Sequence, residues 1–217
     1  MKPKWPGVKC LHKADQSEIW KEGRLSDIRQ VLFRYRSYTP IPFLFAMVLF
    51  ALPTTTTVLC GFAVAILGES LRFWGVAYAG SLTRVTGSVG APEVVVAGPF
   101  AYLRNPLYLG NVLMYCGIGV MANALTPWLV MIALVYFGFQ YAMIVSLEEE
   151  FLEKEFGKEY LEFKKNVPRF LPRLSAYRTT AQDHQKPNWT ECLRSERRTL
   201  QALSIIVVLL LLIWAWR

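Results

Sequence analysis

The sequence predicts an all-α fold: a polytopic membrane helix bundle of about five transmembrane helices, with an amphipathic helix on the cytoplasmic side. Hydrophobic residues make up 53% of its 217 residues, and the mean hydropathy of +0.28 is high for a soluble domain. Long apolar runs alternate with short polar connections, and most basic residues are confined to a few segments. These observations favour a chain that crosses a membrane several times.

The length of an apolar run indicates whether it can span a membrane, because a helix needs about 20 residues to cross the hydrocarbon of a bilayer. Five runs are candidates: residues 41–52, 58–78, 107–122, 125–147 and 200–216. The first has only 12 residues, so it either extends backward through residues 35–40 or enters the bilayer only partly. We expect the last run, rich in Leu, Ile and Val, to anchor the tail or to pack beside the bundle rather than to line a binding pocket.

The positions of the basic residues predict the orientation of the spans. Residues 1–36 contain nine Lys or Arg and residues 148–198 contain eleven, whereas the turns at 53–57 and 123–126 contain none. With five spans and a cytoplasmic N-terminus, the basic segments lie on the cytoplasmic side of a bacterial inner membrane or of the endoplasmic reticulum. Topology therefore accounts for the net charge of +8, and no basic motif interleaved with Gly and aromatic residues suggests nucleic-acid binding.

Charged residues near the spans form two local patterns. Glu69 and Arg72 lie three residues apart on one face of the second span, where they form either a structural ion pair or part of a site. Residues 147–163 repeat apolar residues at helical spacing and include several Lys, which predicts an amphipathic helix at the membrane surface. No metal site is expected, because no zinc spacing is formed by Cys10, Cys60, Cys116, Cys192, His12 and His184.

Two polar segments are separated by an almost entirely apolar stretch. Residues 98–110 read GPFAYLRNPLYLG, and residues 148–150 are three glutamates. If the two apolar runs between them form an antiparallel hairpin, both polar segments return to the same membrane face. We therefore expect a site at that face. No glycine-rich phosphate loop or nucleophile motif of soluble enzymes is found in the sequence.

Several motifs occur in order along residues 60–174. Residues 68–74 read GESLRFW, residues 94–100 read VVVAGPF, and residues 104–108 read RNPLY. The series closes with residues 148–160, EEEFLEKEFGKEY, and residues 167–172, VPRFLP. In this order and at these spacings, the chain resembles the superfamily of isoprenylcysteine carboxyl methyltransferases and phospholipid methyltransferases, which are integral membrane enzymes.

The resemblance implies S-adenosylmethionine as the methyl donor, bound on the cytoplasmic side in a pocket that the amphipathic helix helps to form. By their places in the motifs, the donor-binding residues are Glu93, Val94, Val95, Gly98, Phe100, Arg104, Asn105, Pro106, Leu107, Tyr108, Glu148 and Glu149. The carboxylate of Glu148 suits the ammonium of the donor. The aromatic faces of Tyr108 and Phe100 favour its sulfonium. The resemblance assigns no catalytic residue.

The methyl acceptor does not follow from the resemblance. Members that act on prenylcysteine carry an Arg four residues before the acidic pair, where this chain has Ile144, and a His in place of Asn105. The acceptor stays open among a phospholipid amine, a prenylated or other lipidic carboxylate, and a small thiol. Two alternatives from other classes are an NADPH-dependent membrane reductase related to sterol reductases and a non-catalytic membrane scaffold.

The sequence divides into four parts on this interpretation. They are a basic cytoplasmic N-terminal segment (1–39), a membrane methyltransferase core (40–174), a polar linker (175–199) and a C-terminal transmembrane helix (200–217). The expected partners are the lipid bilayer and a lipophilic or small-molecule acceptor, and the sequence makes no prediction of an oligomeric state.

Overall fold

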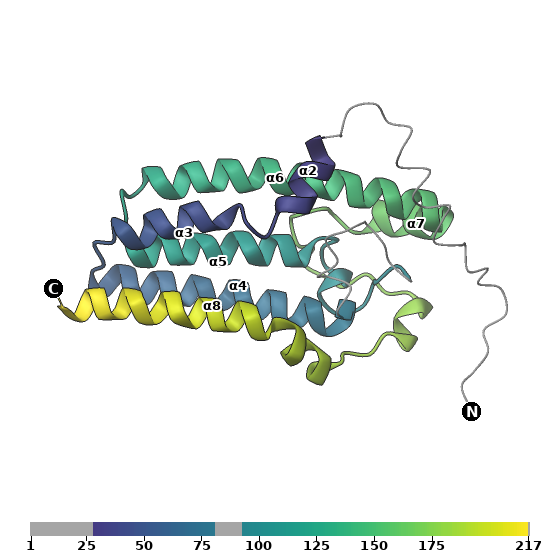
Figure 1. Ribbon diagram of the computed structural model, residues 1–217. Helices are drawn as coiled ribbons and strands as arrows, with labels where there is room; N and C mark the ends of the chain where they lie inside the picture. The colour runs from purple at the N-terminus through teal and green to yellow at the C-terminus, as the bar shows by residue number, and fades with distance from the viewer. Residues whose placement is uncertain (1–27, 81–92, 217) are drawn as a thin grey trace.

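The computed structural model describes residues 28–80 and 93–216, and these residues form a bundle of helices without a β-strand. Five helices run side by side: α3 (Pro40–Leu49), α4 (Thr55–Ala79), α5 (Pro106–Ala122), α6 (Trp128–Phe156) and α8 (Trp189–Trp216) (Figure 1). Helix α2 (Ile28–Tyr35) packs against α6. Helix α7 (Lys158–Asn166) and the 3-10 helices η2 (Gly98–Ala101) and η3 (Thr180–His184) lie at one end of the bundle. The predicted all-α membrane helix bundle is confirmed.

Among the described residues, three helices are long and apolar enough to cross a membrane: α4 with 25 residues, α6 with 29 and α8 with 28. Helices α3 and α5 are apolar but shorter, with 10 and 17 residues. The five predicted spans thus correspond to three long and two short helices. At 1.5 Å per residue, α6 extends about 43 Å, whereas the hydrocarbon of a bilayer is about 30 Å thick. Helix α6 is thus longer than the hydrocarbon is thick.

Two boundaries differ from the sequence-based expectation. Residues 147–163 belong to two helices, because α6 continues to Phe156 and Gly157, with a φ of +51°, separates it from α7. Helix α8 begins at Trp189, so it includes the last eleven residues of the segment 175–199 that we expected to be a linker. The side chain of Asn188 accepts a hydrogen bond from the backbone N–H of Glu191 at 3.0 Å. An Asn in this position caps a helix, which explains the early start.

Helices α4 and α5 pack with their backbones in contact because glycines face one another. A Cβ atom on Gly68 would lie 2.5 Å from the backbone nitrogen of Met114, and a Cβ atom on Gly110 would lie 2.7 Å from the carbonyl oxygen of Gly68. Small residues at helix crossings are typical of membrane bundles. The close approach brings Arg72 of α4 next to Asn111 of α5, and the guanidinium donates a hydrogen bond to the amide oxygen.

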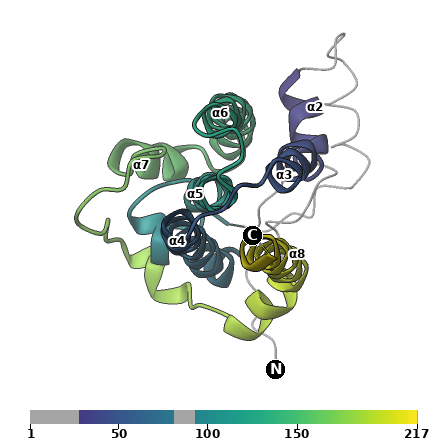
Figure 2. The ribbon, with the colours of Figure 1, turned by 90° about the vertical axis from the view of Figure 1, so that its left-hand side faces the viewer.

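Helix α5 is the central helix of the bundle. Figure 2, which looks along the helices, shows α5 surrounded by α3, α4, α6 and α8. Helices α3 and α8 lie on the same side of the bundle, and α7 lies on the opposite side. Because α5 contacts α3, α4, α6 and α8, side chains along its length can face several neighbours at once.

Candidate functional site

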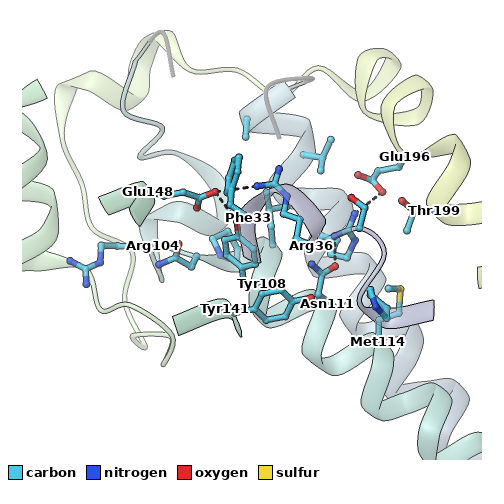
Figure 3. A pocket seen from close by; sticks show the side chains of 18 of the residues that line it. Phe33, Arg36, Arg104, Tyr108, Asn111, Met114, Tyr141, Glu148, Glu196 and Thr199 are labelled. Carbon is cyan, nitrogen blue, oxygen red and sulfur yellow. Dashed lines mark hydrogen bonds and ion pairs between the residues drawn. The ribbon is translucent and has the colours of Figure 1, made fainter. Parts of the chain in front are cut away.

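A cavity of ≈ 780 Å³ lies where α4 ends and α5 begins (Figure 3). Its walls come from the turn between α2 and α3, the ends of α4 and α5, the C-terminal half of α6, and parts of α7 and α8. The volume is within the range of about 300–1,000 Å³ that is usual for small-molecule sites.

Eleven of the twelve residues that the resemblance assigned to the donor pocket line this cavity: Glu93, Val94, Val95, Phe100, Arg104, Asn105, Pro106, Leu107, Tyr108, Glu148 and Glu149. Gly98 is the exception. Its φ is +61°, and a Cβ atom there would lie 2.4 Å from the ring of Tyr78. Gly98 therefore shapes the loop against α4 and does not line the cavity. That the other eleven bind a methyl donor stays a prediction.

Glu148 is a partly buried carboxylate in the wall of the cavity, with 25% of its side chain exposed. The hydroxyl of Tyr108 donates a hydrogen bond to its Oε1 atom at 2.7 Å, and Nη1 of Arg36 lies 3.6 Å from the same oxygen. Figure 3 shows the guanidinium of Arg36 reaching toward Glu148. The guanidinium also lies over the ring of Phe33, 4.1 Å from its centroid. The cavity thus presents a cation and an anion side by side.

Glu149 contacts different partners from those of Glu148. Its side chain is buried, with 3% of the residue exposed, and Nη2 of Arg104 lies 3.3 Å from Oε1. Arg169 donates to both carboxylate oxygens, from Nε at 3.2 Å and from Nη2. These hydrogen bonds raise the pKa of the Arg169 guanidinium above its usual value. Glu149 therefore joins α6 to the loop before α5 and to the segment after α7.

The motif at 104–108 is held in place by the motif at 167–172. The backbone N–H of Arg104 donates to the carbonyl of Pro168 at 2.9 Å, and its Nη1 donates to the carbonyl of Lys164 at 3.1 Å. The side-chain amide of Asn105 donates to the carbonyl of Arg169 at 3.2 Å. The amide nitrogen of Asn105 thus supports the loop, and α5 starts directly afterwards with Pro106, a residue favoured at the first position of a helix.

Two glutamines hold the loop that carries Val94. Oε1 of Gln185 accepts hydrogen bonds from the backbone N–H groups of Val96 and Ala97 at 2.9 and 3.1 Å, and its Nε2 donates to the carbonyl of Val94 at 2.8 Å. Gln182 donates to the carbonyl of Val96 at 2.9 Å. Neither glutamine was predicted from the sequence, since both lie in the segment expected to be a linker. The capping pattern formed by Thr179 and Gln182 is the local signal that was available.

A second group of polar side chains surrounds Arg72. Its Nη2 donates to Oε2 of Glu196 at 2.8 Å, its Nη1 donates to Asn111, and its Nε lies 3.3 Å from Oε2 of Glu69. Glu196 is 1% exposed. We call Glu69, Arg72, Asn111 and Glu196 the Arg72 cluster. The expected ion pair of Glu69 with Arg72 is present, and it is part of this larger cluster.

Helix α8 contributes to the wall of the cavity, although the last apolar run was expected to anchor the tail or to pack beside the bundle. Glu196, Thr199 and Leu203 of α8 line the cavity, and Figure 3 shows Glu196 and Thr199 at its side away from Glu148. Arg36 was not predicted either, because residues 1–39 were expected to form a cytoplasmic segment. Neither Arg36 nor Glu196 lies near a motif, and no local sequence pattern links them to residues 98–110.

Within residues 28–80 and 93–216, no group of three or more His, Cys, Asp or Glu side chains is placed to hold a metal ion. Cys60, Cys116 and Cys192 are free thiols in this part of the chain. Cys10 and His12 lie outside the described residues.

Residues 56–159 match the phospholipid methyltransferase family. This segment, just under half of the chain, contains α5, α6, all of α4 except its first residue, and all twelve residues assigned to the donor pocket. The match confirms the resemblance to the superfamily of membrane methyltransferases.

Two curated proteins are similar to part of the chain. One is the cobalt-zinc-cadmium resistance protein CzcN of Cupriavidus metallidurans, 35% identical over 85 residues, which are 39% of this chain and 38% of that protein. The other is the nickel-cobalt-cadmium resistance protein NccN of Alcaligenes xylosoxydans xylosoxydans, 32% identical over 87 residues, 40% of this chain and 39% of that protein. The chain thus spans under two fifths of the length of either relative. No solved structure matches the chain.

Proposed function

We propose that this protein transfers a methyl group from S-adenosylmethionine to a lipophilic or small acceptor at the cytoplasmic face of a membrane. The match of residues 56–159 to the phospholipid methyltransferase family supports this proposal. The observation that carries the proposal is the arrangement of Glu148, Tyr108 and Arg36 in a cavity of ≈ 780 Å³ lined by the motif residues.

The charges in this cavity fit the amino-acid part of the donor. S-adenosylmethionine carries an α-ammonium and an α-carboxylate on one carbon atom. Glu148 would accept hydrogen bonds from the ammonium, and Arg36 would donate to the carboxylate, because charge-assisted hydrogen bonds are the stronger ones. In this structure Nη1 of Arg36 lies 3.6 Å from Oε1 of Glu148, so the two side chains already present opposite charges next to each other.

The aromatic and apolar lining fits the rest of the donor. The rings of Phe100 and Tyr108 line the cavity, and an aromatic face attracts a sulfonium through the cation–π interaction. When bound, the donor supplies the methyl group from this sulfonium. The residues of the chain would hold donor and acceptor in line and, through apolar walls such as Val94 and Leu107, exclude water from the reacting atoms.

The proposal also covers the kind of acceptor and the side of the membrane on which the cavity lies. The curated relatives are named for resistance to metals, and these names give no acceptor for this chain. A neutral amine, a carboxylate or a thiolate becomes a competent nucleophile once it is desolvated, so each fits a cavity whose described lining residues include no histidine base. We place the cavity on the cytoplasmic side, because residues 148–198, which include the cavity-lining Glu148 and Glu196, contain eleven Lys or Arg.

Isothermal titration of the detergent-purified protein tests the proposal directly. We expect S-adenosylhomocysteine, the product form of the donor, to bind, and NADPH to give no heat of binding. Binding of NADPH without S-adenosylhomocysteine would instead identify a reductase. If neither ligand binds a protein that is monodisperse and helical, the protein is a scaffold and the proposal is wrong.

A further inference from the structure

We infer that Gln140 of α6 is a positioning residue for the donor site, because through Thr39 it holds the turn between α2 and α3 that carries Arg36. The inference rests on the proposed function, in which Arg36 binds the donor carboxylate. The observations that carry it are a buried amide in an apolar part of α6 and a threonine hydroxyl that does not cap its own helix.

Gln140 is a polar residue in an apolar stretch of α6. Residues 128–147 contain no charged side chain, and Gln140 has the only side-chain amide among them. It is 0% exposed. Its Oε1 accepts a hydrogen bond from the hydroxyl of Thr39 at 3.0 Å, whereas its Nε2 has no hydrogen-bond partner within the described part of the chain. Packing alone would favour an apolar side chain here, because a buried amide that lacks partners is costly.

Thr39 directly precedes α3, but its hydroxyl does not cap that helix. A capping threonine normally has an extended backbone and accepts from the second or third N–H of the helix, as Thr54 does before α4. Thr39 instead has helical angles, with a φ of −61° and a ψ of −28°. The third helical residue, Pro42, has no N–H, and the N–H of Ile41 donates to the carbonyl of Tyr38 at 3.1 Å. The Thr39 hydroxyl is therefore available to α6.

The hydroxyl of Thr39 lies within hydrogen-bond distance of two oxygens, the carbonyl of Arg36 at 3.2 Å and Oε1 of Gln140 at 3.0 Å. A hydroxyl has one proton and can donate to only one of them. A half-turn of the Gln140 amide exchanges its nitrogen and oxygen. Nε2 then donates to Thr39, and Thr39 donates to the carbonyl of Arg36, so both donors are used. Two consecutive hydrogen bonds thus join α6 to the backbone of Arg36.

The turn that carries Arg36 is held together by its own backbone. The N–H groups of Tyr38 and Thr39 donate to the carbonyl of Tyr35 at 2.9 and 3.3 Å, and the N–H of Ile41 donates to the carbonyl of Tyr38 at 3.1 Å. Because these bonds overlap along the chain, fixing Thr39 against α6 also restricts Arg36.

Aromatic rings of α3 and α6 pack next to this contact. The ring of Phe43, four residues after Thr39, has its centroid 5.3 Å from that of Tyr136 and 5.2 Å from that of Phe137. Phe137 is 2% exposed. A hydrogen bond in such surroundings is stronger than in water, and its loss leaves a buried polar group without a partner.

The position of the turn matters because its side chains line the cavity. Arg36 and Ser37 belong to the lining, whereas Gln140 is not among the described residues that line it. Nη1 of Arg36 lies 3.6 Å from Oε1 of Glu148, as Figure 3 shows. Hydrogen bonds weaken steeply with distance and misalignment. A turn released from α6 would keep the charge of Arg36 but not its aim, so Gln140 acts on the donor through Arg36.

Isothermal titration with two ligands tests the inference. They are S-adenosylhomocysteine and its decarboxylated analogue S-adenosyl-3-thiopropylamine, which keeps the ammonium and lacks the carboxylate. We expect Gln140→Met and Thr39→Val to raise the Kd of S-adenosylhomocysteine about fivefold and to leave that of the analogue within about twofold. Thr39→Ser, which keeps the hydroxyl, should leave both Kd values unchanged. So should Phe139→Leu, a change at an exposed neighbour of Gln140.

A purely structural role of the contact is tested with the double variant Gln140→Met/Thr39→Val. Replacing both partners by apolar groups of similar shape is nearly neutral or stabilising. We therefore expect the thermal midpoint in detergent to be kept, while S-adenosylhomocysteine still binds about fivefold more weakly. Added to Arg36→Gln, Gln140→Met should cause no further loss, because both changes act on one contact. Equal losses for the two ligands, or a further loss in Arg36→Gln, overturn the inference.

The proposed function can fail separately. If the unmodified protein binds S-adenosylhomocysteine and Gln140→Met binds it equally well, the function stands and the inference does not. If the unmodified protein binds neither ligand, the methyltransferase proposal is wrong, and hydrogen exchange of the backbone at residues 36–41 decides about the turn. Faster exchange in Gln140→Met than in Phe139→Leu means that Gln140 holds the turn, whereas equal exchange overturns the inference.

Discussion

Glu148 and Glu149 are adjacent on α6 but contact different parts of the protein: Glu148 accepts a hydrogen bond from Tyr108 at 2.7 Å, whereas Glu149 lies 3.3 Å from Arg104. Consecutive residues of a helix point about 100° apart, so one carboxylate joins the cavity pair with Arg36 and the other is held by two guanidiniums. Glu150, the third glutamate, is bound by Lys154 at 2.8 Å on its own helix and by Arg29 at 3.1 Å. Substitutions of the three glutamates are therefore expected to have different effects.

Glu148→Gln should weaken the binding of S-adenosylhomocysteine by about 10- to 100-fold, because the amide cannot form a charge-assisted hydrogen bond with the donor ammonium. The amide oxygen still accepts the hydrogen bond of Tyr108, so the fold should be kept. Isothermal titration measures the Kd. Glu150→Gln is the matched control, since the Glu150 side chain is 44% exposed and does not line the cavity. Equal and small effects of both changes would show that the proposed donor contact is wrong.

Glu149→Gln should mainly destabilise the fold. The change leaves Arg104, whose side chain is 9% exposed, without its carboxylate, and breaking a buried ion pair costs about 3–5 kcal/mol. We expect a clearly lower thermal midpoint in detergent for Glu149→Gln and almost none of this loss for Glu150→Gln. A variant with an unchanged midpoint that no longer binds S-adenosylhomocysteine would place Glu149 in direct contact with the donor.

Arg36→Gln should weaken the binding of S-adenosylhomocysteine about tenfold, because the donor carboxylate loses a charged partner. Arg34→Gln, a change at an exposed residue two positions earlier, should have no effect. Titration of both variants tells whether Arg36 binds the donor carboxylate or competes with the donor ammonium for Glu148. Tighter binding by Arg36→Gln would mean that Arg36 competes with the ammonium for Glu148 and does not bind the carboxylate.

The parts of the site that depend on local pattern were predictable from the sequence. Apolar runs predicted the hairpin of α5 and α6, and the motif at 104–108 placed Asn105 and Tyr108 in the wall of the cavity. Glu148 lies 40 residues from Tyr108 in the chain, and their contact follows from the hairpin once both helices are predicted. For these residues, local periodicity and known motif spacing were sufficient.

Contacts between distant segments were not predictable in this way. Glu196 lies 124 residues from Arg72, and Gln185 lies 89 residues from Val96. Their positions depend on how α8 and the segment before it fold back over the bundle. A polar residue at the start of a helix has the same sequence signature whether it faces water or a buried guanidinium. For this reason the polar composition of residues 175–199 predicted a linker.

The glycine contact between α4 and α5 gives a prediction about the framework of the site. In Gly110→Ala the new methyl group would lie 2.6 Å from Cγ of Arg72 and 2.7 Å from the carbonyl oxygen of Gly68. The helices must separate to accommodate it, and such overpacking costs about 1–3 kcal/mol. The separation would also move Arg72 away from its contact with Asn111.

Gly138→Ala is the control for this prediction, because a Cβ atom at Gly138 would have no neighbouring atom within 4 Å. Alanine is favoured over glycine in a helix by about 1 kcal/mol, so Gly138→Ala should keep or raise the thermal midpoint, whereas Gly110→Ala should lower it. Both proteins should insert into the membrane, since neither change alters hydropathy much. If Gly110→Ala is as stable as Gly138→Ala, then α4 and α5 are not in backbone contact, and the position of Arg72 in the cavity wall must have another cause.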